Sequence, residues 1–257
     1  MKYILFERKG RIGYITLNRP EKKNALNSEL VSELKRAFYE SQKDPEIKVI
    51  VLKASGDSFC AGADLLYLQG LQNNTLEENL EDSNNLMELY KLIYTLNKVV
   101  IAQINGHAIA GGCGLVSVCD FAFSTPDANF GYSEVKIGFI NAIVMVFLLR
   151  KLNESHAKQL LLSGNLINAS KAQEIGLIYE VVQLENLEEV VDKFALKLCD
   201  ANSQKSMELI KTMISKIPEL PLEDALSYAS AMNAEARSSE DCKKGISNFL
   251  NKKKIEW

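Results

Sequence analysis

The sequence predicts an α/β fold, in which strands of a parallel sheet alternate with helices. Residues 49–52 (VIVL) and 99–102 (VVIA) are short, continuous apolar runs, which are typical of strands buried on both faces. Apolar residues recur at helical spacing between residues 28 and 38, and again between 86 and 96. This alternation favours right-handed crossover connections between parallel strands. From about residue 190 the pattern is helical throughout, so we expect a helical C-terminal region.

The chain begins with the pattern of a β-hairpin. Residues 3–6 and 13–17 are rich in β-branched and aromatic side chains, and a glycine lies in the turn between them. Pro20 ends this pairing, because proline has no N–H to donate to a sheet. Ser28 is the expected N-cap of the first helix, since its hydroxyl could accept a hydrogen bond from an N–H of the first turn.

The middle of the chain has shorter elements. A glycine-rich turn at 106–114 leads into the apolar segment 115–118, and two short strands are expected at 121–123 and 128–130. In the helical C-terminal region, Pro218 and Pro221 interrupt the helices, because proline cannot continue a helix that already has turns before it.

The composition is that of an ordinary globular protein. Its 257 residues are enough for one large domain with a sizeable core. The 30 basic and 33 acidic side chains nearly balance, giving a formal net charge of -3. No broad positive surface is therefore expected, and we predict neither nucleic acid nor a membrane as a partner.

Cysteine and histidine usage limits the chemistry. The five cysteines form no C-x-x-C pair, which argues against a disulfide framework or a zinc knuckle and indicates a reducing compartment. The two histidines are too few for a histidine-rich metal site, so acid–base chemistry is expected from carboxylates, Lys, Tyr or Cys. The N-terminus reaches charged residues too early for a signal peptide, and the longest apolar stretch, 137–149, is shorter than the about 20 residues that span a bilayer. These features predict a cytoplasmic protein.

Two glycine-containing loops follow predicted buried strands, at 59–65 (FCAGADL) and 105–114 (NGHAIAGGCG). Small residues let a ligand approach the backbone, and N–H groups at a helix start carry a partial positive charge. Two such groups that converge on one carbonyl oxygen make an oxyanion hole, worth about 3–4 kcal/mol per donor. Neither loop matches a P-loop or a dinucleotide fingerprint. Taken alone, each loop is better explained by glycines that ease a tight turn between a strand and a helix.

Glu134 is the candidate acid–base residue. It lies in residues 128–139 between aromatic and aliphatic neighbours, just before the longest apolar run. Partial burial raises the pKa of a carboxyl group and suits it to carry protons near neutral pH. The alternative is a glutamate at a helix start, where the helix dipole favours a negative charge.

Taken in order, these segments resemble the enoyl-CoA hydratase/isomerase (crotonase) superfamily. The resemblance implies a spiral of repeated ββα units at 1–195, which binds and converts the CoA ester, and a helical oligomerisation region at 196–257. It also implies trimers, which commonly stack into hexamers, and no metal or cofactor, because coenzyme A enters as part of the substrate. The matching pieces are Asn18-Arg19-Pro20, Asn24-Ala25-Leu26, 59–65, Asn105-Gly106, 110–113, Cys119-Asp120, Phe130-Gly131, Ser133-Glu134, Ile137-Gly138, 161–164, 169–177 and 239–257.

The resemblance also carries over individual site residues. The oxyanion donors are implied to be the backbone N–H groups of Ala63 and Gly111, with Glu134 as the catalytic acid–base residue. An acyl-CoA, or an acyl group on a carrier, is the implied substrate. The positions implied to bind it are Lys23, Ala25, Ala61, Asp64, Leu65 and Gly112, with Phe249 and Lys252 sometimes reaching it from a neighbouring subunit.

One catalytic position departs from the family pattern. Hydratases with two glutamates carry the first of them three residues after the oxyanion glycine, and Gly114 stands there. The leading hypothesis is hydration of a branched or acidic enoyl-CoA, because relatives similar to 3-methylglutaconyl-CoA hydratase share this glycine and the segment 133–138. The alternatives are Δ3,Δ2-enoyl-CoA isomerisation, for which one base is sufficient, acyl-CoA or acyl-carrier decarboxylation, and a non-catalytic CoA-ester-binding subunit.

Three further side chains receive structural interpretations. Cys113 has no histidine nearby in the sequence and is expected to pack in the core. His107 is expected to be solvated or hydrogen-bonded. Asp120 is expected to anchor a turn or a helix.

Overall fold

The strands form two sheets in the computed structural model, which describes residues 1–257. Neighbouring strands are parallel except for the pairs β1–β2 and β8–β9, which are antiparallel. The larger sheet has the order β1 (Ile4–Lys9), β2 (Ile12–Leu17), β3 (Val49–Ala54), β5 (Val99–Ile104), β7 (Phe121–Ser124) and β10 (Glu180–Val181). The smaller sheet has the order β4 (Ser58–Cys60), β6 (His107–Ile109), β8 (Asn129–Gly131) and β9 (Ile167–Asn168).

Three consecutive strand pairs, β3–β4, β5–β6 and β7–β8, divide between the two sheets. The first strand of each of these pairs joins the larger sheet and the second joins the smaller one, and helices follow each pair. This arrangement confirms the predicted α/β fold of repeated ββα units. The helices are α1 (Ser28–Lys43), α2 (Leu65–Gly70), α3 (Leu76–Thr95), α4 (Gly111–Val118), α5 (Ala142–Lys151), α6 (Glu154–Ser163), α7 (Ala169–Glu174), α8 (Leu184–Ala201), α9 (Gln204–Lys216), α10 (Leu222–Ser238) and α11 (Glu240–Leu250).

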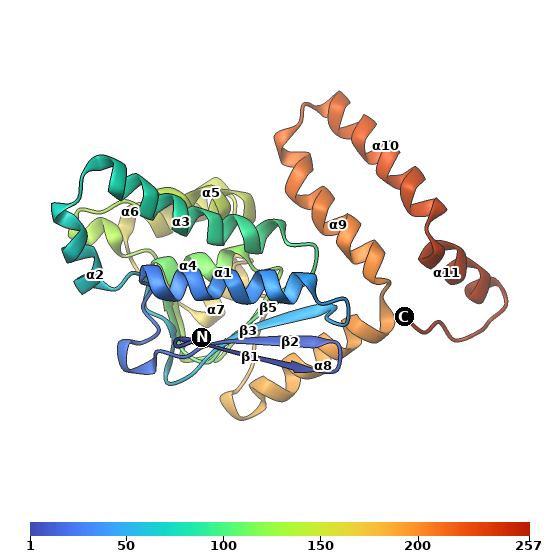
Figure 1. Cartoon of the computed structure of the whole chain (residues 1–257), viewed down its shortest axis with the longest axis horizontal. Coiled ribbons are helices and arrows are strands. Elements are labelled where there is room, and N and C mark those ends of the chain that lie inside the picture. Colours follow the sequence, from blue (N-terminus) through green and yellow to red (C-terminus); the bar gives the residue numbers. More distant parts are fainter.

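The larger sheet is buried on both faces because successive side chains point to opposite sides of a strand. In β3, Ile50 and Leu52 belong to the main core, which also contains side chains of α1 and α3. Val49 and Val51 belong to a second core, which α8 closes with Leu187, Val191, Ala195 and Cys199. Figure 1 shows α1 and α3 on one side of these strands and α8 on the other. The uninterrupted apolar runs in the sequence follow from this double burial.

The structure corrects the expected start of α1. The N-cap is Asn27, whose side chain accepts a hydrogen bond from the Leu30 N–H at 2.9 Å, and Ser28 is the first helical residue. Both residue types cap well, but Asn27 has the extended backbone (φ -131°, ψ 172°) that capping requires. The apolar segment 115–118 forms the second half of α4, which begins at Gly111, so the glycine-rich turn ends earlier than residue 114.

The last three helices project away from the rest of the molecule as an arm (Figure 1). The predicted division at residue 195 falls inside α8, and this helix packs on the sheet as far as Cys199. The body therefore includes α8, and the arm begins with α9. Pro221 is the N-cap of α10, as expected for a residue that interrupts the helical region. None of the helices combines the length and apolarity needed to cross a membrane.

Candidate active site

Three neighbouring strands of the smaller sheet bring the chemistry-bearing segments together. β4 pairs in parallel with β6, and β6 pairs in parallel with β8. Because parallel strands end at the same edge of a sheet, the segments that follow them gather there. Residues 61–64 follow β4, Ala110 and Gly111 follow β6, and Glu134 lies three residues beyond β8. The Ala110 N–H donates to the Gly131 carbonyl at 2.7 Å, which joins the second and third segments directly.

The first loop is held against the segment that follows β2. The Leu26 N–H donates to the Gly62 carbonyl at 2.7 Å, and the Asp64 N–H donates to the Leu26 carbonyl at 2.8 Å. The Ala61 N–H donates to the Lys23 carbonyl at 3.0 Å. The predicted CoA-binding residues Lys23, Ala25, Ala61 and Asp64 are thus brought side by side, with Leu65 exposed at the start of α2.

Asp64 is an anchor of this loop. Its carboxylate pairs with Arg19 at 2.8 Å and accepts hydrogen bonds from the Leu66 and Tyr67 N–H groups at the start of α2. Burial opposes ionisation of this carboxyl, but these hydrogen bonds outweigh it and hold the pKa below the ordinary value. Asp64 therefore stays ionised and fixes the loop geometry.

The two glycine-containing loops approach each other very closely. A Cβ atom on Gly62 would lie 2.6 Å from Ala110 Cβ and 3.3 Å from Gly111 N, and Gly62 also has a φ of +89°. Ala110 itself adopts a φ of 54°, which is strained for a residue with a side chain. Only glycine at position 62 allows the backbones to meet in this way.

The backbone N–H groups of Ala63 and Gly111 have no hydrogen-bond acceptor within the chain. Gly111 is the first residue of α4, so its N–H has no intrahelical partner and lies at the positive end of the helix. Both residues are half-buried. Two free donors on adjoining loops are what an oxyanion hole requires.

Packing explains the other two glycines of α4. A Cβ on Gly112 would lie 2.1 Å from the Cys60 carbonyl oxygen, so this predicted substrate-binding residue lies against the β4 backbone. A Cβ on Gly114 would lie 2.4 Å from Val144 Cγ1 and 3.2 Å from Tyr90 Cε1. Tyr90 on α3 and Val144 on α5 therefore fill the space into which a side chain at position 114 would extend.

Tyr90 also contacts the start of α4. Its ring is fully buried, and its hydroxyl donates to the Gly111 carbonyl at 2.8 Å. Burial raises the pKa of this phenol well above its ordinary value, so it stays protonated and remains a donor.

Glu134 begins a short 3-10 helix, Glu134–Ile137, and its side chain is half-buried. Burial raises the pKa of its carboxyl group above the ordinary value. A hydrogen bond from its own backbone N–H lowers this pKa, but by less than burial raises it. The Asn141 side chain lies against it. With its nitrogen turned toward the carboxylate, the Asn141 amide donates to the two Glu134 oxygens at 2.7 and 2.9 Å.

Cys113 and His107 adopt the structural roles expected of them. Cys113 is fully buried in the main core, and burial raises the pKa of its thiol to about 12, which keeps it neutral. His107 is exposed, and its Nδ1 accepts a hydrogen bond from the Asn129 N–H at 3.1 Å.

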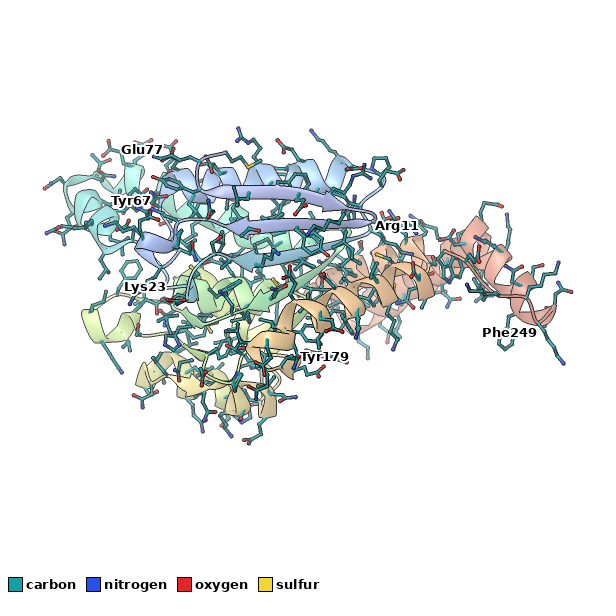
Figure 2. The ribbon with its side chains drawn as sticks, turned by 90° about the horizontal axis from the view of Figure 1, so that it is seen from below. Arg11, Lys23, Tyr67, Glu77, Tyr179 and Phe249 are labelled. Atoms are coloured by element: carbon teal, nitrogen blue, oxygen red, sulfur yellow. The ribbon has the colours of Figure 1, made fainter.

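Phe249 and Lys252 do not join the site of their own chain. Phe249 lies on α11 and Lys252 follows that helix. Figure 2 shows Phe249 at one end of the molecule and Lys23 toward the other. Their assignment to the site of a neighbouring subunit stays a prediction.

Sequence reasoning missed Tyr90, Asn141 and Val144. Tyr90 and Val144 come from helices far apart in the sequence, and no local pattern marks them as neighbours of Gly114. A signal for Asn141 was present, because it is a polar residue within the longest apolar run.

Comparisons with known proteins agree on one family. A family model described as enoyl-CoA hydratase/isomerase matches residues 7–257. A protein of Thermus thermophilus whose name places it among enoyl-CoA hydratases is 36% identical over 249 residues, 95% of this chain and 96% of that protein. The crotonyl-CoA hydratase of Syntrophomonas wolfei is 33% identical over 256 residues, 99% of this chain and 97% of that protein. The crystal structure of an enoyl-CoA hydratase from Mycobacterium smegmatis superimposes with a TM-score of 0.92 at 29% identity, covering 99% of this chain and 98% of that one.

Proposed function

The chain belongs to the enoyl-CoA hydratase/isomerase family, and we propose that it hydrates an enoyl-CoA with Glu134 as its single acid–base residue. One observation carries this proposal: two free backbone donors and a half-buried carboxyl group follow three neighbouring parallel strands. Ala63 follows β4, Gly111 follows β6 and Glu134 follows β8. The names of the relatives, which are hydratases, support hydration as the reaction. A branched or acidic acyl group, as in 3-methylglutaconyl-CoA, is the proposed substrate.

The oxyanion hole serves the step in which charge develops. When water adds to C3 of the enoyl group, the electron pair of the double bond moves to C2 and is delocalised onto the thioester oxygen. The N–H groups of Ala63 and Gly111 would donate to that oxygen. Because they are fixed by the backbone, they need no reorganisation, and losing one such donor typically costs about 3–4 kcal/mol.

A single carboxyl group is sufficient for the proton transfers. Ionised Glu134 takes a proton from the water while the water oxygen bonds to C3. The neutral acid then returns that proton to C2, which leaves a 3-hydroxyacyl-CoA and regenerates the carboxylate. The raised pKa of Glu134 suits both transfers, because a group that gains and loses a proton in one cycle works best near the ambient pH.

Isomerisation is the second candidate, favoured by the space around Gly114. Tyr90 and Val144 occupy the place of a second carboxylate, and no other acidic side chain is bonded to Glu134. Moving a double bond from C3 to C2 needs only one base, which takes a proton from C2 and returns it to C4. The same oxyanion hole would stabilise the dienolate between these steps.

Coenzyme A recognition and assembly complete the proposal. Lys23 is exposed, and we propose that its ammonium group binds a phosphate of coenzyme A. Phe249 and Lys252 of a neighbouring subunit would contact the same ligand in a homotrimer or a hexamer. Exposed apolar side chains along the arm support such an assembly.

Product analysis in isotopically labelled water tests the proposed reaction. The protein is incubated in 18O-water with crotonyl-CoA, a 3-enoyl-CoA and 3-methylglutaconyl-CoA, and the products are measured by mass spectrometry. We expect an 18O-labelled 3-hydroxyacyl-CoA from at least one 2-enoyl substrate. Conversion of the 3-enoyl substrate alone, without 18O, would replace hydration by isomerisation. Absence of every product would contradict both.

A further inference from the structure

We propose that Asn141 is a positioning residue that holds the Glu134 carboxyl group in both of its protonation states. The inference rests on the proposed function for the proton-transfer role of Glu134. The contact itself is independent of that role, because the end of the Asn141 amide lies 2.7 and 2.9 Å from the two carboxyl oxygens.

Asn141 departs from the behaviour of the other asparagines that begin helices here. It is the N-cap residue of α5, yet its side chain makes no capping hydrogen bond. The Asn27, Asn153 and Asn168 side chains each accept from an N–H of the first helical turn, at 2.9, 3.0 and 2.8 Å. Those three asparagines have the extended backbone that capping requires, whereas Asn141 has φ -87° and ψ 39°. The Asn141 side chain is therefore not used as a cap and is available for the contact with Glu134.

The amide can bond to the carboxyl group whether or not it is protonated. When Glu134 is ionised, Asn141 Nδ2 donates to its oxygens. When Glu134 is neutral, its O–H can donate to Asn141 Oδ1 after a half-turn of the amide. An amide offers both a donor and an acceptor, which an apolar side chain at this position would not match.

The surroundings of Glu134 leave Asn141 as its main side-chain partner. Glu134 takes part in no ion pair. The titratable side chains influenced by its charge are the Tyr90 phenol from α3 and the Cys113 thiol from α4, and burial keeps both neutral. Asn141 is only 7% exposed, so water does not replace its hydrogen bonds easily.

The two bonds differ in strength, which fixes the sign of the effect. A hydrogen bond to an ionised group is about twice as strong as one between neutral groups. Asn141 therefore favours the carboxylate over the acid and offsets part of the effect of burial. Removing the amide should raise the pKa of Glu134 by about one unit.

Infrared titration of the unliganded protein measures this directly. The carbonyl stretch of protonated Glu134 is assigned by its loss in Glu134→Gln, and its midpoint is followed against pH. We expect Asn141→Leu, which nearly preserves volume, to raise that midpoint by about one pH unit. The acid limb of the pH profile of kcat should shift in the same direction as this midpoint, while KM changes little. An unchanged midpoint and an unchanged profile would overturn the proposal.

A second variant and a matched control separate positioning from folding. Asn141→Asp keeps the shape of the side chain and places a second carboxyl group within hydrogen-bonding distance of Glu134. The two carboxyl groups should share one proton and lose it at a higher pH than Glu134 loses its proton in Asn141→Leu. Asn153→Leu removes a true cap and should lower Tm without moving the Glu134 midpoint. A midpoint shift that Asn153→Leu reproduces would contradict the proposal.

The infrared readout also distinguishes this inference from the proposed reaction. If Asn141→Leu shifts the Glu134 midpoint but no enoyl-CoA is turned over by the unmodified protein, the positioning contact is supported and the proposed function fails. If turnover is present and the midpoint is insensitive to Asn141, the positioning inference alone fails.

Discussion

At the scale of single residues, Gly114 limits the chemistry proposed for the site. Without a side chain there, Glu134 is the one carboxyl group proposed to act, and the space is closed by Val144 Cγ1 and the Tyr90 ring. The sequence revealed the glycine and, through family resemblance, the absence of a second glutamate. It did not reveal the packing, because α3 and α5 meet at this point only in the folded chain.

We expect Gly114→Ala to destabilise the protein by about 1–3 kcal/mol, as overpacking of a core usually does. The added methyl group would lie 2.4 Å from Val144 Cγ1, and a β-branched side chain has little freedom to turn away. Chemical denaturation measures the loss. Adding Val144→Ala to Gly114→Ala should recover part of this lost stability. If the double mutant loses as much stability as the two single mutants added together, the packing account is contradicted.

Residue-level prediction depended on what marks each residue in the sequence. The family resemblance implied the backbone N–H groups of Ala63 and Gly111 as oxyanion donors, and that role stays a prediction. Asn141 could not be assigned, because its position suggests an ordinary helix cap. Only the tertiary structure shows its side chain directed to Glu134.

At the scale of elements, predictability followed the strength of local patterns. The strands with continuous apolar runs were predicted within a few residues, because burial on both faces leaves an unambiguous pattern. The N-terminal half of α3 was not predicted, since its exposed face is acidic and rich in Asn. Thr75 and Glu78 nevertheless form a capping box there, a signal that was present in the sequence.

Lys211 on α9 links the arm to the body. Its ammonium group, on α9, donates to the Lys98 carbonyl at 2.8 Å and to Asp120 at 2.7 Å, and the residue is 6% exposed. Asp120 also accepts from the Val100 N–H, which confirms the anchoring role expected of it.

Lys211→Met should therefore lower stability by about 2 kcal/mol, the typical contribution of a hydrogen bond to a charged group. For a chain of this size the corresponding fall in Tm is roughly 4–8 °C. Lys216→Met on the same helix is the control, because its ion pair with Glu219 is exposed and contributes little. Equal melting temperatures for the two variants would contradict the link.

At the scale of the whole molecule, the body and the arm differ in how they are buried. The body encloses two cores on the faces of the larger sheet, whereas α10 and α11 contain no buried residue. Large apolar side chains remain exposed along the arm: Ile210, Ile214, Leu222, Leu226, Ile246, Phe249 and Leu250. Many large apolar side chains exposed on one part of a molecule indicate an interaction site, and we expect them to be covered by further copies of the chain.

Analytical ultracentrifugation tests this expectation. The protein should sediment as a trimer or a hexamer, and Leu226→Asp on the arm should shift it toward monomer by burying a charge in the interface. Leu184→Asp is the control, because Leu184 is similarly exposed but lies on α8 in the body. A monomeric unmodified protein, or equal dissociation by both variants, would be incompatible with an interface on the arm.

Turnover by Glu134→Gln tests the central claim, that one carboxyl group performs the proton transfers. The glutamine keeps the shape of the side chain and an oxygen that can accept from Asn141, but it cannot carry a proton. We expect kcat to fall by about two orders of magnitude or more while the Kd for the CoA ester stays within about threefold. Glu185→Gln, at an exposed position on α8, should leave both unchanged. A near-normal kcat in Glu134→Gln would contradict the mechanism.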